Sequence, residues 1–418
     1  MKDSGISWVG EIPKEWSVNR AKYCFVNTKE IAGCRSDRYE RLALTMNGVI
    51  KRSKDDSNGL QPEKFETYQI LRPDELVFKL IDLQNVSTSR VGLSPYLGLV
   101  SPAYIILKSN KRVLPAFAEK YFLMLWKNQI FNALGDAGVR SNLNSKDLLE
   151  LSIPFPSLAE QQRIAEFLDK ECGKIDGLKA DIQAQIDTLE QYKRSIITEA
   201  VTHGLNPSAP MKDSGAGWMP LIPLHWKADK LKFHLRQRGI KNQIDKQVLS
   251  LYREYGIVPK DSRDDNHNVT SEDVSDYRYV RVGDFVVNKM KAWQGSVAVS
   301  NYEGIVSPAY FVYEFSDDLI NKRYFHYLMR NKTYATEFRR LSGGIREGQW
   351  DLPSEALNNT IILLPPLDEQ QEIADYLDNK CAEIEQIIVD KKSQIETLDG
   401  YKKSLIFEYV TGKKEIAL

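Results

Sequence analysis

Residues 1–16 read MKDSGISWVGEIPKEW, and residues 211–226 read MKDSGAGWMPLIPLHW. Two shorter motifs recur in the same way: VSPAY at residues 100–104 and 306–310, and LAEQQ at 158–162, which returns as LDEQQ at 367–371. The copies stand about 203 to 210 positions apart, close to half of the 418 residues, so the duplication spans nearly the whole chain. The sequence therefore predicts two similar halves, which can present two like surfaces around a pseudo-two-fold axis.

The composition is typical of a globular protein. Of the 418 residues 42% are hydrophobic, enough for about two to four domains with their own cores. No run reaches the roughly 18 apolar residues of a membrane span, and the N-terminus is polar. The four cysteines (Cys24, Cys34, Cys172 and Cys381) show neither CxxC nor disulfide-framework spacing. We therefore expect a cytosolic protein with reduced thiols and without a metal site.

Each half opens with a segment of short apolar runs separated by turn signals, which is typical of a mixed α+β domain of about 150 residues. One amphipathic helix is predicted at residues 115–134 of the first segment and one at 319–341 of the second. The predicted strands are Glu75–Leu80, Tyr104–Leu107 and Leu151–Phe155 in the first segment, and Asp284–Val287, Tyr310–Tyr313 and Ile361–Leu364 in the second.

Each half ends in a long helical stretch that begins after proline, at Pro156 and at Pro365-Pro366. Apolar residues recur there at heptad spacing, which indicates a coiled coil. The predicted interface residues are Leu168, Ile175, Leu178, Ile182, Leu189, Tyr192 and Ile196 in the first stretch, and Leu377, Ile384, Leu398, Tyr401 and Leu405 in the second. Lys391 stands where the first copy has Ile182, and it either specifies the register or lays its apolar stem along the helix edge.

Neither helix can bury its apolar stripe alone, so we expect the two to pack on each other. The linker at residues 203–210 is short and the second half retraces the first, which favours an antiparallel arrangement. The predicted fold is α+β, with two similar globular domains separated by two long helices that form an intramolecular antiparallel coiled coil. The expected boundaries are 1–156 and 206–365 for the domains, 157–205 for the first helix, and 366–418 for the second helix and a C-terminal tail.

The net charge is zero, with 57 basic and 57 acidic residues, but the charge is unevenly distributed. Residues 20–54 contain nine Lys/Arg and three Asp/Glu, and residues 230–263 repeat those numbers. The helical stretches 159–203 and 368–408 carry net charges of −3 and −6. The positive excess in each globular segment favours a polyanion such as duplex DNA as the target, although a solvated loop face can show the same excess.

Motifs for catalysis are missing from the sequence. The only Pro-Pro, Pro365-Pro366, is followed by Leu and does not match the (N/D)-P-P-(Y/F) loop of an amino-methyltransferase, and no phosphate loop of a nucleotide-driven motor occurs. Asp74, Glu75 and Lys79 lack the spacing of a nuclease cluster and fit the charged start of a strand. The five histidines are scattered without ligand spacing. The sequence therefore predicts a protein that is not an enzyme.

The repeated motifs resemble those of the specificity subunits of type I restriction–modification enzymes. SGISWVGEIPKEW and SGAGWMPLIPLHW are similar to the motif that opens each domain in that family. IPFPSLAEQQRIAEFLD and LLPPLDEQQEIADYLD are similar to the motif that leads from each target-recognition domain into its spacer helix. The resemblance covers nearly the whole chain, and the repeats occur in the family's order.

The resemblance implies that each globular domain reads one half of a bipartite, asymmetric DNA site, while the helices set the gap between the halves. It further implies a cytoplasmic complex of a prokaryote with double-stranded DNA, two methyltransferase (modification) subunits and restriction (translocase–nuclease) subunits. S-adenosylmethionine, ATP and Mg would be bound by those partner subunits. This chain would hold no cofactor and no metal.

Candidate DNA contacts are the basic and amide side chains in loops, because these groups bind phosphates and base edges. Polar loops inside the basic segments contain Lys51, Arg52 and Lys54 in the first domain and Arg253, Lys260 and Arg263 in the second. A second group follows the strand copies: Lys79 and Gln84 in the first domain, and Lys289, Lys291 and Gln294 in the second. Glutamine can bond adenine bidentately, but the alternative is a turn whose amide caps the backbone, with Trp293 in the core.

Gly138-Val139-Arg140 and Gly344-Ile345-Arg346 recur at the same offset as the VSPAY motif. A glycine lets the backbone approach a phosphate closely, and the arginine supplies charge, so Arg140 and Arg346 are the strongest single candidates. The alternative is a strand-entry turn with a structural ion pair.

Two rival hypotheses belong to other classes of protein. The chain could be a structural tether in which the coiled coil spaces two protein-binding domains, although the paired basic segments argue against this. It could also be a fused methyltransferase–nuclease, but both required motifs are missing.

Overall fold

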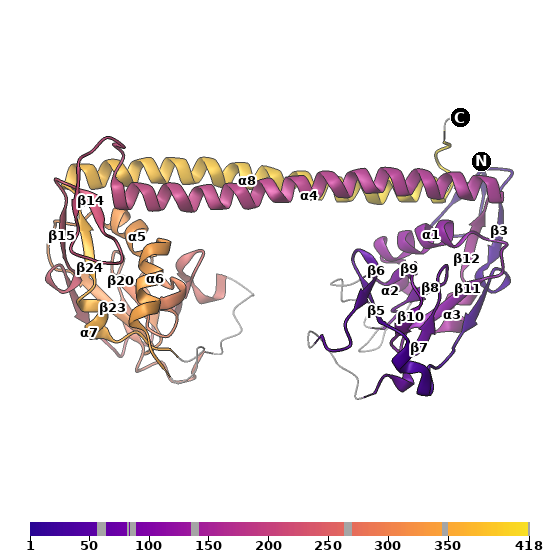
Figure 1. The fold of residues 1–418 in the computed structure, drawn as a ribbon, viewed down its shortest axis with the longest axis horizontal. Coiled ribbons are helices and arrows are strands. Elements are labelled where there is room, and N and C mark those ends of the chain that lie inside the picture. The colour runs from indigo at the N-terminus through magenta and orange to yellow at the C-terminus, as the bar shows by residue number, and fades with distance from the viewer. Residues whose placement is uncertain are drawn as a thin grey trace. The chain divides into compact units, whose positions relative to one another are not determined.

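The computed structural model describes residues 1–56, 64–81, 83, 89–134, 142–262, 270–344 and 350–416. These residues form two compact units. One unit contains Met1–Ile182 and Lys392–Leu418, and the other contains Gln183–Lys391. Each unit therefore holds one globular domain together with part of both long helices (Figure 1).

The globular domain of the first unit is built from short strands. One sheet has the order β4-β11-β8-β9, made of Phe25–Thr28, Ile105–Ser109, Leu76–Phe78 and Val91–Leu93. Another has the order β6-β5-β10-β7, made of Gly48–Arg52, Arg41–Thr45, Gly98–Val100 and Gln69–Leu71. The short pairs are β1 (Lys2–Asp3) with β2 (Glu11–Ile12), and β12 (Ser152–Phe155) with β3 (Ser17–Arg20).

The globular domain of the second unit repeats this arrangement. Its larger sheet has the order β16-β23-β20-β21, made of Leu235–Arg238, Tyr310–Phe315, Phe285–Asn288 and Val297–Val299. The remaining pairs are β13 (Met211–Asp213) with β14 (Leu221–Pro223), β15 (Lys227–Lys230) with β24 (Ile361–Leu364), β17 (Leu249–Tyr252) with β18 (Gly256–Pro259), and β19 (Arg278–Val280) with β22 (Gly304–Val306).

In each domain one helix packs on a four-stranded sheet. The first domain has α1 (Pro115–Lys127), α2 (Ile130–Leu134) and α3 (Ser145–Glu150), and the second has α5 (Lys322–Arg330), α6 (Lys332–Leu341) and α7 (Ser354–Asn358). The packing helix is α1 on β4-β11-β8-β9 in the first domain and α5 on β16-β23-β20-β21 in the second. Phe122 of α1 meets Phe78 edge to face at 5.0 Å between ring centroids. Phe325 of α5 meets Phe285 in the same way, also at 5.0 Å. The two copies of the sequence therefore pack a helix on a sheet in the same way.

Both helices that were predicted as single pieces are broken in the structure. The stretch predicted at 115–134 stops at Lys127, and Gln129 adopts a positive φ of 60° before α2 begins. The stretch predicted at 319–341 divides at Asn331, whose side chain accepts hydrogen bonds from the amides of Thr333 and Tyr334 and caps α6. Local capping therefore overrides the apolar periodicity at both places.

The repeated Glu-Gln-Gln motif fastens each long helix to its domain. Gln161 is fully buried, accepts from the amide of Leu114 at 2.8 Å and donates to the carbonyl of Pro156 at 3.0 Å. Gln370 makes the matching bonds to Asn321 and Pro365 at 2.8 and 2.9 Å. A buried amide that satisfies two backbone groups explains why this residue returns in both copies.

The long helices are α4 (Leu158–His203, 46 residues) and α8 (Leu367–Val410, 44 residues). In the first unit, Lys179 and Asp176 of α4 contact Asp399 and Lys402 of α8 at 2.5 and 2.7 Å. In the second unit, Lys193 pairs with Glu385. Because the residue number rises along one helix as it falls along the other, the two segments in each unit run antiparallel, as predicted.

The seam between the helices differs from the predicted heptads in one respect. Leu168, Ile175, Leu377, Ile384 and Leu405 are buried, and Ile182, Leu189, Ile196 and Leu398 are partly buried. Leu178, Tyr192 and Tyr401 are 53, 54 and 57% exposed, so their assignment to the interface is wrong. The second seam position lies four residues after the first, not three, and is filled by Cys172, Ile186, Ala200, Cys381 and Ile388.

Lysines occupy three positions of the same i+4 row, and Ile395 and Tyr409 occupy two more. Lys179, Lys193 and Lys402 have side chains only 26–27% exposed, and each pairs with an acid of the opposite helix. Lys391 is also partly buried, and its ammonium donates to the Gln185 amide oxygen across the helices at 2.5 Å. These lysines bury their stems and keep their charged ends at the edge of the pair.

None of the described helices is long and apolar enough to cross a membrane.

Candidate nucleic-acid interface

Four of the predicted DNA contacts lie outside the described residues: Gln84, Arg140, Arg263 and Arg346. The other candidates lie on or just after two β-hairpins, directly after β8, and around the 3-10 helix of residues Ala292–Gln294. Each domain carries its own set.

The basic residues of the first domain lie on the β5–β6 hairpin and the loop that follows it. Lys51 forms an exposed ion pair with Glu40 at 2.7 Å, and this hydrogen bond raises the pKa of Lys51. Arg52 pairs with Asp56 at 2.6 Å. Lys54 donates to the carbonyl of Ser36 at 2.9 Å and lies over the ring of Phe65. Exposed pairs of this kind contribute little to folding stability, so these cations can exchange their partners for phosphates at low cost.

The same hairpin exposes apolar side chains, Met46 in its turn and Ile50 in β6. Met46 is 51% exposed and Ile50 is 41% exposed. Thr45 shapes the turn, because its hydroxyl donates to the carbonyl of Gly48 at 3.0 Å and accepts from the amide of Asn47 at 3.2 Å. Lys79 is half-buried just beyond β8, where its amide donates to the carbonyl of Arg90.

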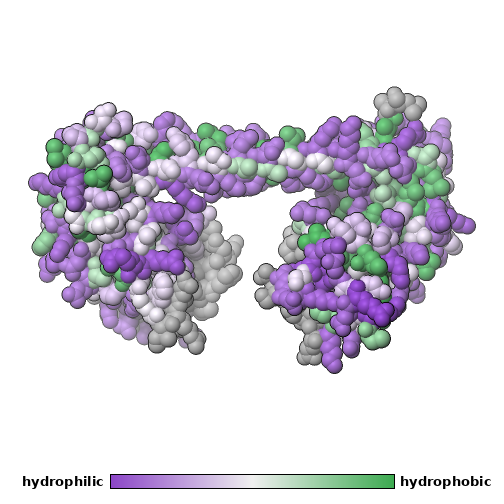
Figure 2. Space-filling model, in the orientation of Figure 1, coloured by the Kyte–Doolittle hydropathy of each residue, from purple (hydrophilic) through white to green (hydrophobic). Residues whose placement is uncertain are grey.

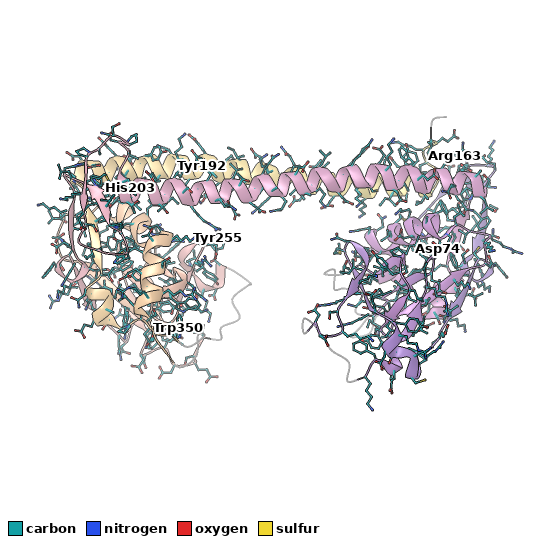
Figure 3. All side chains as sticks on the ribbon, viewed as in Figure 1. Asp74, Arg163, Tyr192, His203, Tyr255 and Trp350 are labelled. Atoms are coloured by element: carbon teal, nitrogen blue, oxygen red, sulfur yellow. The ribbon has the colours of Figure 1, made fainter. Side chains whose placement is uncertain are left out.

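The matching hairpin of the second domain is β17–β18. Its turn contains Arg253 and an exposed Tyr255, which is labelled in Figure 3. Lys260 follows β18, and its ammonium donates to the hydroxyl of Thr270. The hairpin therefore places the predicted Arg253 beside an aromatic ring that the sequence analysis had not selected as a contact.

Lys289, Lys291 and Gln294 lie around the 3-10 helix η6 (Ala292–Gln294). Lys289 pairs with Asp351 at 3.0 Å, while Lys291 and Gln294 are exposed. The alternative that put Trp293 in the core is wrong, since its ring is half-exposed and packs against Trp350 at an interplanar angle of 59°, with ring centroids 5.7 Å apart. The guanidinium of Arg339 lies 5.9 Å from the centroids of both rings, which gives this edge of the domain aromatic and cationic character.

The positive excess of each basic segment is partly offset by acids from elsewhere in the same domain. Glu150 lies against Arg20 and Lys22 at 2.5 and 2.8 Å. In the second domain, Asp276 and Glu303 pair with Lys241 and Lys246. The local count of charges in the sequence therefore overstated the free positive charge, because tertiary partners are invisible to it.

Two arginines of the second domain, one buried and one partly buried, make their contacts within the domain. Arg238 lies 9% exposed between Asp284 and Glu314. Arg330 of α5 lies 2.9 Å from Nε2 of His326. Burial, followed by the charge of Arg330, lowers the pKa of His326 to about 4, so this histidine is neutral near pH 7. Both arginines therefore make contacts within the domain, Arg238 with two carboxylates and Arg330 with the backbone of the β17–β18 turn.

The helix pair carries exposed apolar residues on its outside. Leu178 and Tyr401 belong to the first unit, and Tyr192 and Ile387 to the second. Ile387 is the repeat counterpart of Leu178, and Tyr401 is the counterpart of Tyr192. In the space-filling view, the visible face of the helices is mostly hydrophilic with separate hydrophobic spots (Figure 2).

No group of three or more His, Cys, Asp or Glu side chains that could hold a metal occurs among the described residues. An open pocket of about 530 Å³ in the second unit is lined by Lys322, Arg323, His326, Tyr327 and Asp378 among others. Arg323 there is paired with Asp375 and Asp378 at 2.7 and 2.5 Å.

Sequence reasoning missed Arg330, Trp350 and Tyr255. Arg330 sits 77 positions from the turn that it holds, and Trp350 meets Trp293 across 57 positions, so no local pattern joins either pair. Tyr255 had a signal, because it stands beside Gly256 in a basic loop between two apolar runs.

Comparison with known proteins places the chain in a family. The model of the type I restriction modification DNA specificity domain matches residues 55–188 and again residues 240–397. The chain is 25% identical to the type I restriction enzyme MjaVIII specificity subunit of Methanocaldococcus jannaschii over 339 residues, covering 76% of this chain and 74% of that protein. It is 20% identical to the type I restriction enzyme EcoKI specificity subunit of Escherichia coli K12 over 396 residues, covering 85% and 81%.

A solved structure has the same fold. The chain aligns with one from a structure described as "Structural basis underlying complex assembly and conformational transition of the type I R-M system", with a TM-score of 0.68 and 13% identity over 97% of this chain and 100% of that one. The double match favours the DNA-reading hypothesis over the tether hypothesis, since the matched model is a DNA specificity domain. The chain belongs to the family of type I restriction–modification DNA specificity domains and contains that domain twice.

Proposed function

We propose that this chain selects the DNA sequence at which a type I restriction–modification complex acts. Each globular domain reads one half of a bipartite, asymmetric site, and the chain itself performs no chemistry. The observation that carries this proposal is that each globular domain has its own hairpin with basic side chains, Lys51 and Arg52 in the first and Arg253 in the second.

The two hairpins differ in chemistry, which supports an asymmetric site. The β5–β6 tip exposes Met46 beside Asn47, whereas the β17–β18 tip exposes Tyr255 beside Arg253. Base edges in the major groove are distinguished by hydrogen bonds and by apolar contact with the thymine methyl, so two unlike tips select unlike sequences.

In this proposal α4 and α8 act as the spacer between the half-sites. Within each unit the two helices are joined by apolar seam residues and by ion pairs such as Lys179–Asp399 and Lys193–Glu385. A two-helix pair with such a seam resists bending more than a single helix, and its length follows from 1.5 Å of rise per residue.

The proposed partners are two methyltransferase subunits, joined by restriction subunits. The exposed apolar residues of the helix pair support two like docking sites, since Leu178 with Tyr401 in one unit repeats as Ile387 with Tyr192 in the other. Large exposed apolar side chains on a polar helix surface are a frequent mark of a partner interface. S-adenosylmethionine, ATP and Mg are assigned to these partners, and the complex to the cytoplasm of a prokaryote.

The decisive experiment is methylome sequencing of a host that expresses this chain with its methyltransferase partner. We expect one bipartite motif with two unrelated half-sites. Gel-shift titrations of the purified complex should show affinity that falls steeply with salt, because phosphate contacts release counterions.

Two variants then test the independence of the domains. Arg140→Ala should weaken recognition of one half-site, and Arg346→Ala should weaken the other. A complex that methylates without sequence preference would refute the proposal, and equal damage to both half-sites by each variant would refute independent reading.

A further inference from the structure

The β17–β18 turn of the second domain is held by an arginine from a distant helix. Nη2 of Arg330, in α5, donates to the carbonyl of Arg253 at 2.6 Å and to the carbonyl of Glu254 at 3.0 Å. These are two consecutive backbone groups of the turn that joins Tyr252 to Gly256. A planar guanidinium that binds two adjacent carbonyls restricts the turn to one conformation.

The residue that closes the turn is adapted to this arginine. Gly256 has a φ of +73°, and a Cβ at this position would lie 2.9 Å from Nη1 of Arg330 and 3.6 Å from Cε1 of His326. Any larger residue would therefore be strained and would also push the guanidinium away from the carbonyls.

The other side of the guanidinium lies against a second side chain of the same helix. Nη1 of Arg330 lies 2.9 Å from Nε2 of His326, which is one helical turn earlier in α5. The amide of Val299 in β21 donates to Nδ1 of His326 at 3.3 Å and so holds the imidazole in place. The partly buried His326 thus limits where the guanidinium can lie.

A turn between two paired strands does not need an arginine from a distant helix to hold its carbonyls. The equivalent β5–β6 turn of the first domain closes with local bonds alone, between Thr45, Asn47 and Gly48. At Gly48 an added Cβ would have no heavy atom within 4 Å. The clamp is therefore a feature of the second domain, and it fixes the part of the hairpin that carries Arg253 and the 58% exposed Tyr255 (Figure 3).

On the basis of the proposed function, we propose that the clamped turn is the element with which the second domain reads its half-site, and that Arg330 is a positioning residue for it. Arg253 and Tyr255 make the contacts with the DNA. Arg330 acts through them by removing conformational freedom that binding would otherwise have to freeze.

The test uses the complex of the full chain with its methyltransferase partner and duplexes that carry the wild-type motif or a single base change in either half-site. Arg330→Met should reduce discrimination at the second half-site by about tenfold or more, because the loss of one well-placed base contact has that effect. Discrimination at the first half-site should stay unchanged. Arg330→Lys should show discrimination at the second half-site that is intermediate between the wild type and Arg330→Met, since an ammonium keeps the charge but lacks the planar guanidinium.

Arg323→Met is the matched control. Arg323 lies in the same helix α5 and also makes two charged bonds, but to Asp375 and Asp378 of α8 and not to the turn. It should affect thermal stability without changing discrimination at either half-site. If Arg330→Met and Arg323→Met behave alike, Arg330 is only structural and the inference is overturned.

Two surface variants test the inference even if Arg330→Met does not fold. Arg253→Ala and Tyr255→Ala change exposed side chains and should each weaken the second half-site selectively. Unchanged discrimination in both would overturn the inference while leaving the proposed function intact. A wild-type complex without any sequence preference would instead refute the proposed function.

Discussion

Lys179 of α4 and Asp399 of α8 form an ion pair, with Nζ 2.5 Å from Oδ1, at a seam position where a coiled coil would ordinarily carry an apolar side chain. The pair exists only because the helices run antiparallel, which brings position 179 opposite position 399. The same relation recurs between Lys193 and Glu385 in the second unit. Charged pairs at the seam therefore specify the direction and register of the helices at some expense of stability.

Charge reversal tests this register. Lys179→Glu should lower the free energy of unfolding of the full chain by about 1 kcal/mol, because an attraction becomes a repulsion at the edge of the seam. The double variant Lys179→Glu/Asp399→Lys should recover most of the loss. Urea denaturation of the four proteins gives the coupling energy. If the change in unfolding free energy of the double variant equals the sum of the changes in the two single variants, the two side chains do not interact in solution.

Gly304 tests the close approach of two strands. A Cβ there would overlap the carbonyl oxygen of Gln247 and lie 2.7 Å from Cγ of Leu249. Gly304→Ala should therefore destabilise the second domain by about 1–3 kcal/mol, measured by thermal denaturation. Gly217→Ala is the control, since nothing lies within 4 Å of its Cβ position, and it should stay within about 0.5 kcal/mol of the wild type. If Gly304→Ala leaves the thermal stability unchanged, the two strands can move apart at little cost in free energy.

His326 makes stability depend on pH. Its folded-state pKa of about 4 lies below the unfolded value near 6.5, so the unfolded chain binds a proton that the folded chain refuses. The stability present above pH 6.5 is thus lost as the pH falls toward 4. Between pH 7 and pH 5 the loss is on the order of 1–2 kcal/mol. His326→Gln should remove this part of the pH dependence in urea titrations, and an identical slope in both proteins would contradict the assignment.

The spacer hypothesis makes a geometric prediction. One heptad inserted after Ile182 in α4 and another after Ile395 in α8 face each other in the register that pairs Lys179 with Asp399. They keep the seam and add about 10 Å to the helix pair. The unread gap between the half-sites should then lengthen by about three base pairs at ~3.4 Å each. Methylome sequencing reports the gap directly, and an unchanged gap would rule out the helices as the spacer.

Much of the fold could be predicted from the sequence because its signals are local or repeated. The duplicated opening, the VSPAY pentapeptide and the Glu-Gln-Gln motif identified two like domains. The seven-residue spacing of Leu168, Ile175 and Ile182 identified the long helices. Strands such as Ile361–Leu364 followed from apolar runs between turn signals. The breaks at Gln129 and Asn331 were missed, because a single capping residue ends a helix without disturbing its apolar period.

The candidate interface could be predicted only in part. Arg253 and the loop around Tyr255 were identifiable from their charge and turn residues. The ion pairs that offset the basic segments, such as those of Glu150, could not be identified, since the acids lie outside those segments.

By itself the sequence determined the duplication, the two helices and their antiparallel course, because helical period and repeat order are properties of the chain alone. Tertiary structure decided which side chains lie in the seam, and so left Leu178, Tyr192 and Tyr401 exposed. It also decided that Arg330 holds a turn 77 positions away, and that Trp293 meets Trp350. The physical reason is that contacts between distant residues depend on how whole elements pack, and no local spacing encodes that packing.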